Sequence, residues 1–157
     1  MGAILQAAQR VSTKPLAVSG SHFTHAGVYV GSGRMVDATF GRPISEVSVW
    51  NYCQTRQLQV RRLSDPSIPQ RQIDDIAFEA RAHIGEPYST LALLLAKLWP
   101  GTVPLRKNLY CSTFVGLVVA DATGVRLANR PNYQPLLPSI LGLHPDLTAV
   151  PVEWRSL

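Results

Sequence analysis

The stretch at 107–120, KNLYCSTFVGLVVA, constrains the fold most, because so apolar a helix has to be buried against other elements. The helix is predicted to run from about Cys111 to Thr123 and to end at Gly124. Amide N–H groups in its first turn and the positive end of its dipole favour thiolate over thiol, and thiolate is the nucleophilic form. Cys111 is therefore a candidate nucleophile, and the alternative is an inert core thiol.

Residues 24–40, THAGVYVGSGRMVDATF, predict a β-hairpin in which a Gly-Ser-Gly-Arg turn joins two β-rich runs. His25 stands at the start of the hairpin, and Asp37 lies on its second strand. A histidine at a strand edge is commonly a solvated surface residue, so its interpretation depends on its partners. A carboxylate on the same face can hold the imidazole in one tautomer and stabilise its protonated form, as the third member of a catalytic triad does.

Whether His25 and Asp37 share a face depends on the loop of this hairpin. A two-residue loop, Ser32-Gly33, pairs Val28 with Asp37 and places the carboxylate on the face opposite His25. A three-residue loop pairs Tyr29 with Asp37 instead and places both side chains on one face. A Cys-His-Asp triad requires the second register, or a bulge with the same effect.

Together these motifs resemble the circularly permuted, papain-like branch of the NlpC-type cysteine hydrolase superfamily, which is related to lecithin:retinol acyltransferase-like proteins. Such proteins carry His followed by Ala/Val-Gly-Ile/Val-Tyr-Ile/Val-Gly on a strand, a polar residue on the next strand, and later Tyr-Cys-Ser at the start of a helix. Here the matches are His25 with AGVYVG, Asp37 in MVDAT, and Tyr110-Cys111-Ser112. The resemblance covers residues 20–120 and follows the permuted order of His, polar residue and Cys.

The resemblance implies an α+β, papain-like fold, in which a small, mainly antiparallel sheet packs against helices and the nucleophile opens one of them. It also offers Tyr88, in Gly-Glu-Pro-Tyr, as a match to a family Gly-x-Pro-Tyr segment. The Tyr88 hydroxyl is then a candidate donor to an oxyanion, beside the backbone N–H of Cys111; the alternative is a packed turn aromatic. Tyr110 and Ser112, which flank the cysteine, are further oxyanion or cleft candidates.

Two positions depart from the family pattern. Relatives often have Glu or His as the third polar residue, so Asp37 is a shorter variant. They also tend to have Glu after Tyr-Cys-Ser, where this chain has Thr113.

Three functions follow as hypotheses. The first is hydrolysis of an amide bond through an acyl-enzyme on Cys111, with peptidoglycan stem peptides as the suggested substrate. The second is thiol-based acyl transfer or ester hydrolysis on lipids. The third is a binding module that keeps the fold without turnover, against which the joint presence of Cys, His and carboxylate argues.

The segment Ser89–Trp99, STLALLLAKLW, bears on the choice between peptide and lipid because it is apolar almost all round. It is far shorter than the roughly 20 apolar residues that span a bilayer. Burial in the core is one interpretation, and contact with an acyl chain or membrane is the other. No transmembrane segment is expected.

At 157 residues, 46% of them hydrophobic, the chain is expected to form a single catalytic domain over 1–157. Residues 3–11 place apolar side chains at helical spacing and predict a short helix within a candidate N-terminal extension, 1–14. The net charge of +5 is dispersed over the chain, which suits an anionic target or simply a solvated surface. No helix-turn-helix or RNA-binding signature is present, so no nucleic-acid partner is expected.

The two cysteines, Cys53 and Cys111, are read as thiols rather than as a disulfide framework, with Cys53 in the core. Four scattered histidines lack the paired spacing of a metal site, so neither a metal nor a cofactor is expected. The N-terminus shows no secretion signal, which predicts a cytoplasmic protein or export by a specialised secretion system. If the protein is an exported toxin, a cognate inhibitor is expected.

The remaining pattern predicts a mixed segment at 43–53 with a turn of helix at 47–50, a strand at 57–63, an amphipathic helix at 70–84, a helical turn at 138–141 and a final strand at 148–152.

Overall fold

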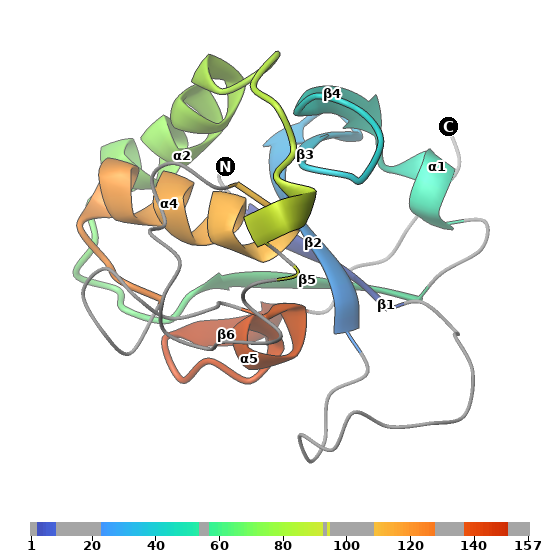
Figure 1. The fold of residues 1–157 in the computed structure, drawn as a ribbon. Coiled ribbons are helices and arrows are strands. Elements are labelled where there is room, and N and C mark those ends of the chain that lie inside the picture. Colours follow the sequence, from blue (N-terminus) through green and yellow to red (C-terminus); the bar gives the residue numbers. More distant parts are fainter. Residues whose placement is uncertain are drawn as a thin grey trace.

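A six-stranded sheet with the strand order β4-β3-β2-β1-β5-β6 forms the centre of the protein (Figure 1). The computed structural model describes residues 3–8, 23–53, 57–92, 94, 109–127 and 137–150, with only the backbone described at 3–8, 53 and 57. All neighbouring strands are antiparallel. The strands are β1 (Ala3–Ala8), β2 (Phe23–Gly31), β3 (Arg34–Asp37), β4 (Ser45–Ser48), β5 (Gln57–Leu63) and β6 (Leu147–Val150).

Two helices, α2 (Gln70–Ala82) and α4 (Cys111–Thr123), lie side by side against the sheet (Figure 1). They share one core with the sheet residues that alternate with His25 on β2. That core includes Ala26, Val28 and Val36 from the strands, Ile76 and Ala80 from α2, and Phe114, Val115 and Val118 from α4. The predicted α+β architecture, with helices packed on a small antiparallel sheet, is confirmed.

The helix that begins at Cys111, α4, is the element whose bounds were predicted best from the sequence. It runs from Cys111 to Thr123, and its cap Gly124 has a positive φ of 75°. In this left-handed conformation the Gly124 N–H donates to the Ala120 carbonyl, which satisfies one of the last carbonyls of the helix. The predicted strand at 57–63 and helix at 70–84 are also confirmed, as β5 and α2, and the turn at 138–141 is α5 (Pro138–Gly142).

The prediction of a helix at 3–11 is wrong over 3–8, and residues 9–11 lie outside the described residues. Residues 3–8 form β1, which pairs with β2 on one side and with β5 on the other. Six residues carry too short a pattern to separate the two periodicities, and pairing on both sides supplies the partners that this backbone needs. The N-terminal residues 3–8 are thus an interior strand of the sheet.

The segment at 43–53 differs from its prediction in detail. Residues 45–48, which were not expected to form a strand, pair with β3 as the edge strand β4. The helical turn follows as α1 (Trp50–Cys53), rather than at 47–50. Strand β6 covers 147–150, and residues 151–152 of the predicted final strand lie outside the described residues. The side chain of Cys53 also lies outside them, so its predicted core position stays a prediction.

The apolar segment that begins at Ser89 is helical where it is described, at 90–92 and 94. The Ser89 hydroxyl accepts a hydrogen bond from the Ala92 N–H (3.2 Å), as an N-cap residue does. Ala92 is buried, but Leu91 and Leu94 are 66% and 52% exposed. Burial therefore does not hold for these two leucines. Within the described part of the chain, no helix combines the length and apolarity needed to cross a membrane.

Candidate active site

A β-bulge places His25 and Asp37 on one face of the hairpin. The loop has two residues, Ser32 and Gly33, both with positive φ (51° and 68°), and Gly31 pairs with Arg34. The register then shifts between Tyr29 and Gly31, so that Asp37 pairs with Gly27. Gly27 lies two residues from His25, and residues two apart on a strand share a face. The loop is thus the shorter of the two considered, and the bulge supplies the effect that a triad requires.

Strands β2 and β3 approach closely at Gly27. A Cβ atom at this position would lie 3.1 Å from the Val36 carbonyl oxygen and 3.2 Å from the Asp37 Cβ, and it would collide with the Met35 side chain. These contacts are tighter than ordinary van der Waals separations. The absence of a side chain at Gly27 therefore helps to set the distance between Asp37 and strand β2, which carries His25.

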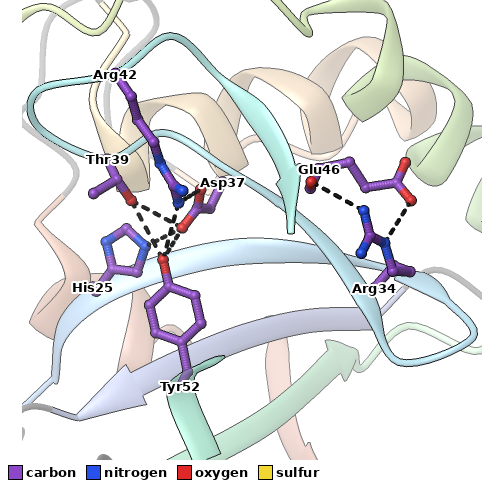
Figure 2. A network of polar contacts seen from close by, with 7 residues as sticks. All are labelled: His25, Arg34, Asp37, Thr39, Arg42, Glu46 and Tyr52. Atoms are coloured by element: carbon purple, nitrogen blue, oxygen red, sulfur yellow. Dashed lines mark hydrogen bonds and ion pairs between the residues drawn. The ribbon is translucent and has the colours of Figure 1, made fainter. Parts of the chain in front are cut away.

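Asp37 is fully buried, and four side chains donate hydrogen bonds to its carboxylate (Figure 2). The Oδ2 atom accepts from His25 Nε2 (3.2 Å), from Thr39 Oγ1 (2.9 Å) and from the Tyr52 hydroxyl. The Oδ1 atom accepts from Arg42 Nη2 (2.8 Å). An ionised carboxylate offers roughly four acceptor sites, so these donors use its capacity.

The electrostatics of Asp37 follow from this network. Burial alone raises the pKa of a carboxyl group, but the hydrogen bonds from His25, Tyr52 and Thr39 and the charge of His25 outweigh burial, and the pKa of Asp37 lies below its ordinary value. The same carboxylate acts on its neighbour in return. Burial and the bond to Asp37 raise the pKa of the Tyr52 hydroxyl to about 12, so the phenol stays protonated and donates.

His25 connects Asp37 to Cys111. Burial alone would lower the pKa of the imidazole, but hydrogen bonds with Asp37 and with the Cys111 side chain, together with the charges of both groups, raise that pKa to about 9. The His25 side chain is 12% exposed, so its interactions are only weakly screened by water. The structure thus brings together the three candidate catalytic residues predicted from the sequence. His25 lies near the start of β2, Asp37 at the end of β3 and Cys111 at the start of α4.

Cys111 is the first residue of α4 and is 6% exposed. It packs with Tyr88, Ala92 and Tyr110 in a small apolar cluster. Thr113 closes the start of the helix: its hydroxyl accepts from the Tyr110 N–H (2.9 Å) and donates to the Tyr110 carbonyl (3.0 Å). Thr113, the residue that departs from the family pattern, therefore fixes the backbone on the N-terminal side of Cys111.

Backbone hydrogen bonds hold Tyr88 beside Cys111. The Ser89 N–H donates to the Leu109 carbonyl (2.8 Å), and the neighbouring Ile44 N–H donates to the Glu86 carbonyl (2.8 Å). Burial and then the charge of Cys111 raise the pKa of Tyr88 to about 12, so its hydroxyl remains a donor. Tyr88 is half-buried.

The other two oxyanion or cleft candidates are buried. Tyr110 is fully buried, and its hydroxyl has no hydrogen-bond partner among the groups that the structure describes. Burial and the charges of Cys111 and Tyr88 raise its pKa above the ordinary value. Ser112 is also fully buried.

Sequence reasoning missed three members of the network: Thr39, Arg42 and Tyr52. Thr39 and Arg42 lie two and five positions after Asp37, so a search for polar residues just beyond the strand would have found them. Tyr52 lies on α1, and its ring stacks on that of His25 with centroids 5.6 Å apart and planes inclined by 8°. No pattern in the sequence pairs a tyrosine on α1 with a histidine on β2.

Comparison with known proteins identifies the family. The model of the permuted papain-like amidase enzymes, YaeF/YiiX, C92 family, matches residues 1–139. The chain belongs to this family. A search of curated proteins found no match. Among solved structures, a crystal structure described as the metalloprotein YiiX from Escherichia coli O157:H7 is similar, with a TM-score of 0.69 and 20% identity over 98% of this chain and 97% of that one.

Membership in the C92 family confirms the resemblance and the papain-like, permuted fold, and it makes this chain a member of an amidase family of cysteine hydrolases. The similar structure supports the fold over the full length, since it covers nearly all of both chains. That protein is described as a metalloprotein. In the described ranges of this C92 member, no three histidine, cysteine, aspartate or glutamate residues form a group that could hold a metal ion.

Proposed function

We propose that the protein hydrolyses an amide bond through an acyl-enzyme, with Cys111 as nucleophile, His25 as general base and acid, and Asp37 as the residue that orients His25. One observation carries this proposal: the His25 imidazole is hydrogen-bonded to a buried carboxylate, and its pKa is raised in part by its interaction with the Cys111 side chain. An imidazole in this position stabilises the thiolate by holding the proton, and a carboxylate on its far side stabilises the imidazolium that results.

The tautomer of His25 follows from its partner. Because Asp37 is ionised and accepts only, His25 Nε2 carries a proton and donates to Oδ2. The other ring nitrogen, Nδ1, is then the atom that exchanges a proton with Cys111. Nε2 then keeps Asp37 as its partner throughout the reaction, while Nδ1 exchanges protons with Cys111, the leaving amine and water.

The reaction proceeds in two stages. The Cys111 thiolate attacks the amide carbon, and the carbonyl electron pair moves onto oxygen to give a tetrahedral oxyanion. The oxyanion collapses, the C–N bond breaks, and the proton on His25 Nδ1 goes to the leaving amine, which leaves a thioester on Cys111. Water then attacks the thioester and gives a proton to His25, and the carboxylic acid product leaves as the thiolate–imidazolium pair is restored.

The backbone N–H of Cys111 and the hydroxyl of Tyr88 are the proposed donors to the oxyanion. An amide in the first turn of a helix has no partner within the helix, so it is available to a developing negative charge. Tyr88 packs on Cys111 and keeps its proton. We assign Tyr110 and Ser112 to the walls that support the nucleophile, because both are fully buried.

Two substrate classes fit this chemistry. Amide bonds of peptidoglycan stem peptides are the first, since the family consists of amidases. Acyl groups of lipids are the second, because the helical segment next to Tyr88 exposes two apolar side chains, Leu91 (66%) and Leu94 (52%). Up to the acyl-enzyme, the bond-making step is the same for both.

Mass spectrometry can separate the substrates. Purified sacculi and phospholipid vesicles are incubated separately with wild-type protein, with Cys111→Ala and with the control Cys53→Ala. We expect wild type and Cys53→Ala to release new peptide products from sacculi, and Cys111→Ala to release none. Cleavage of lipid alone would move the assignment to the acyl-lipid substrate, and equal product release by Cys111→Ala would refute the mechanism.

A further inference from the structure

Tyr52 stands out within the Asp37 network because it contacts two of the proposed catalytic residues at once. Its hydroxyl donates to Asp37 Oδ2, the same oxygen that accepts from His25 Nε2. Its ring stacks on the His25 imidazole, with centroids 5.6 Å apart and planes inclined by 8° (Figure 2). Thr39 and Arg42 also donate to Asp37, but no ring contact joins either of them to His25 among the described residues.

We propose that Tyr52 is a positioning residue that fixes the plane of the His25 imidazole through its ring and the acceptor of that imidazole through its hydroxyl. This inference rests on the proposed function, since it assigns a role to a side chain that acts through His25. Tyr52 is 7% exposed and comes from α1, so a part of the fold remote in sequence from both strands contributes to the site.

The physical argument has two parts. The hydrogen bond from Nε2 to Asp37 does not by itself fix the plane of the His25 ring. If the ring rotated, Nδ1 would move away from the Cys111 sulfur. A flat ring stacked at 8° opposes this rotation, because turning the imidazole would break the parallel contact. The face of a phenol also attracts a cation, so the ring favours the protonated imidazole that the leaving group requires.

The hydroxyl acts on the other partner. Asp37 reaches His25 across one hydrogen bond of 3.2 Å, which is at the long end for N–H···O, so a small movement of the carboxylate would break it. The Tyr52 hydroxyl, approaching Oδ2 from α1, restrains that movement. Together the two contacts hold the donor on β2 and the acceptor on β3 of one hydrogen bond against a single side chain of α1.

Two substitutions separate the two contacts. Tyr52→Phe keeps the ring and removes the hydroxyl, and Tyr52→Leu removes both. Thr39→Val is the matched control, because it removes another hydroxyl that donates to Oδ2 without touching the imidazole. The readouts are the rate at which iodoacetamide alkylates Cys111, measured by mass spectrometry with Cys53 as internal reference, and the pH at which His25 titrates in NMR spectra.

We expect Tyr52→Leu to slow alkylation at neutral pH about tenfold and to lower the titration midpoint of His25, because the stacked ring no longer favours the imidazolium. Tyr52→Phe should leave the titration midpoint of His25 close to wild type and lose roughly threefold in rate, because it removes the hydroxyl that restrains Asp37 and keeps the stacked ring. Thr39→Val should leave the midpoint closest to wild type.

The inference is overturned if folded Tyr52→Leu alkylates at the wild-type rate with the wild-type midpoint. If that variant does not fold, Tyr52→Phe decides: a wild-type rate there, or a loss no greater than in Thr39→Val, overturns the role of Tyr52. Failure of the proposed function looks different. In that case wild-type Cys111 itself alkylates no faster than Cys53, and its rate follows the titration of an ordinary thiol near pH 8.5.

Discussion

The two halves of the site are built in different ways. Around Asp37 the contacts are polar and numerous: four donors converge on a carboxylate that is fully buried. Around Cys111 they are apolar, with Tyr88, Ala92 and Tyr110 packed in one cluster with it. The comparison teaches that the imidazole is held by hydrogen bonding from the Asp37 side, whereas Cys111 is positioned by the start of α4 and by apolar packing.

Loss of the imidazole should have the largest effect, because it links both halves. We expect His25→Ala to lower turnover by about 10³-fold or more, since it removes the proton acceptor of the thiol and the donor to the leaving group in one change. Turnover on the substrate identified from sacculi or vesicles measures it. His83→Ala, in which the substituted imidazole pairs with Glu86, serves as the control. Full activity in His25→Ala would show that the two halves do not communicate through this residue.

Asp37→Asn tests the polar half with less disruption. The amide keeps the shape of the carboxylate but loses its charge, so it stabilises the imidazolium less and leaves Arg42 next to a neutral group. We expect turnover to fall by about 10²-fold, less than in Cys111→Ala, because orientation assists the bond-making step without performing it. If turnover equals that of wild type, another residue orients His25.

The pH dependence of stability and turnover tests whether the Asp37 and Cys111 halves of the site are coupled through His25. The folded pKa of His25, about 9, lies above the ordinary 6.5, so protonation of His25 stabilises the fold, fully below about pH 6.5 and progressively less as pH rises through 9. Turnover should decline over the same upper range, because the imidazolium that protonates the leaving group is lost. Part of this high pKa comes from Cys111. NMR titration should therefore give a lower midpoint in Cys111→Ala, and an unchanged midpoint would mean that the thiol is not coupled to the imidazole.

Gly27→Ala tests how the backbone sets the polar half. The added methyl group would lie 3.1 Å from the Val36 carbonyl oxygen and 3.2 Å from the Asp37 Cβ, so β3 has to move outward. Because Asp37 moves with its strand, we expect turnover to drop about tenfold, as small misplacements of catalytic groups do. Thermal unfolding should show a decrease in Tm as well. A variant with wild-type turnover and a wild-type His25 midpoint would show that the register is not sensitive to this contact.

Sequence reasoning found the three proposed catalytic residues because each stands in a local pattern: a strand start, a strand end or a helix start. It specified that Asp37 had to share a face with His25, but not how, since a two-residue loop followed by a bulge depends on positive φ at Ser32 and Gly33 together with pairing to neighbouring strands. It mistook 3–8 for a helix because the strand is defined by two partners distant in sequence.

Tyr52 was missed for the same reason. Its role depends on contacts between α1 and residues 15 and 27 positions earlier in the chain, which no spacing rule connects. By contrast, the cap of α4 was predictable, since Gly124 acts within its own helix. What can be predicted here is local hydrogen bonding and periodicity, and what cannot is the convergence of separate elements on one carboxylate.

Substitutions of two arginines, for which we expect the smallest effects, compare the ion pair of the Asp37 network with an ordinary ion pair of the protein surface. Arg42 pairs with Asp37, which is fully buried, whereas Arg34 pairs with Glu46, whose side chain is 24% exposed (Figure 2). We expect Arg34→Gln to change the free energy of unfolding by less than about 0.5 kcal/mol and to leave turnover unchanged, as is usual for exposed ion pairs. Arg42→Gln should cost about 1–2 kcal/mol, less than a fully buried pair because the Arg42 side chain is itself 40% exposed.

The two arginine variants should also differ in turnover. Loss of Arg42 frees Asp37 Oδ1 and loosens the carboxylate, so Arg42→Gln is expected to reduce turnover about threefold. Chemical denaturation and turnover, measured side by side, check both numbers. If the two variants behave alike, the donors on Oδ2 hold Asp37 without help from Oδ1, and the polar half of the site depends on His25, Thr39 and Tyr52 alone.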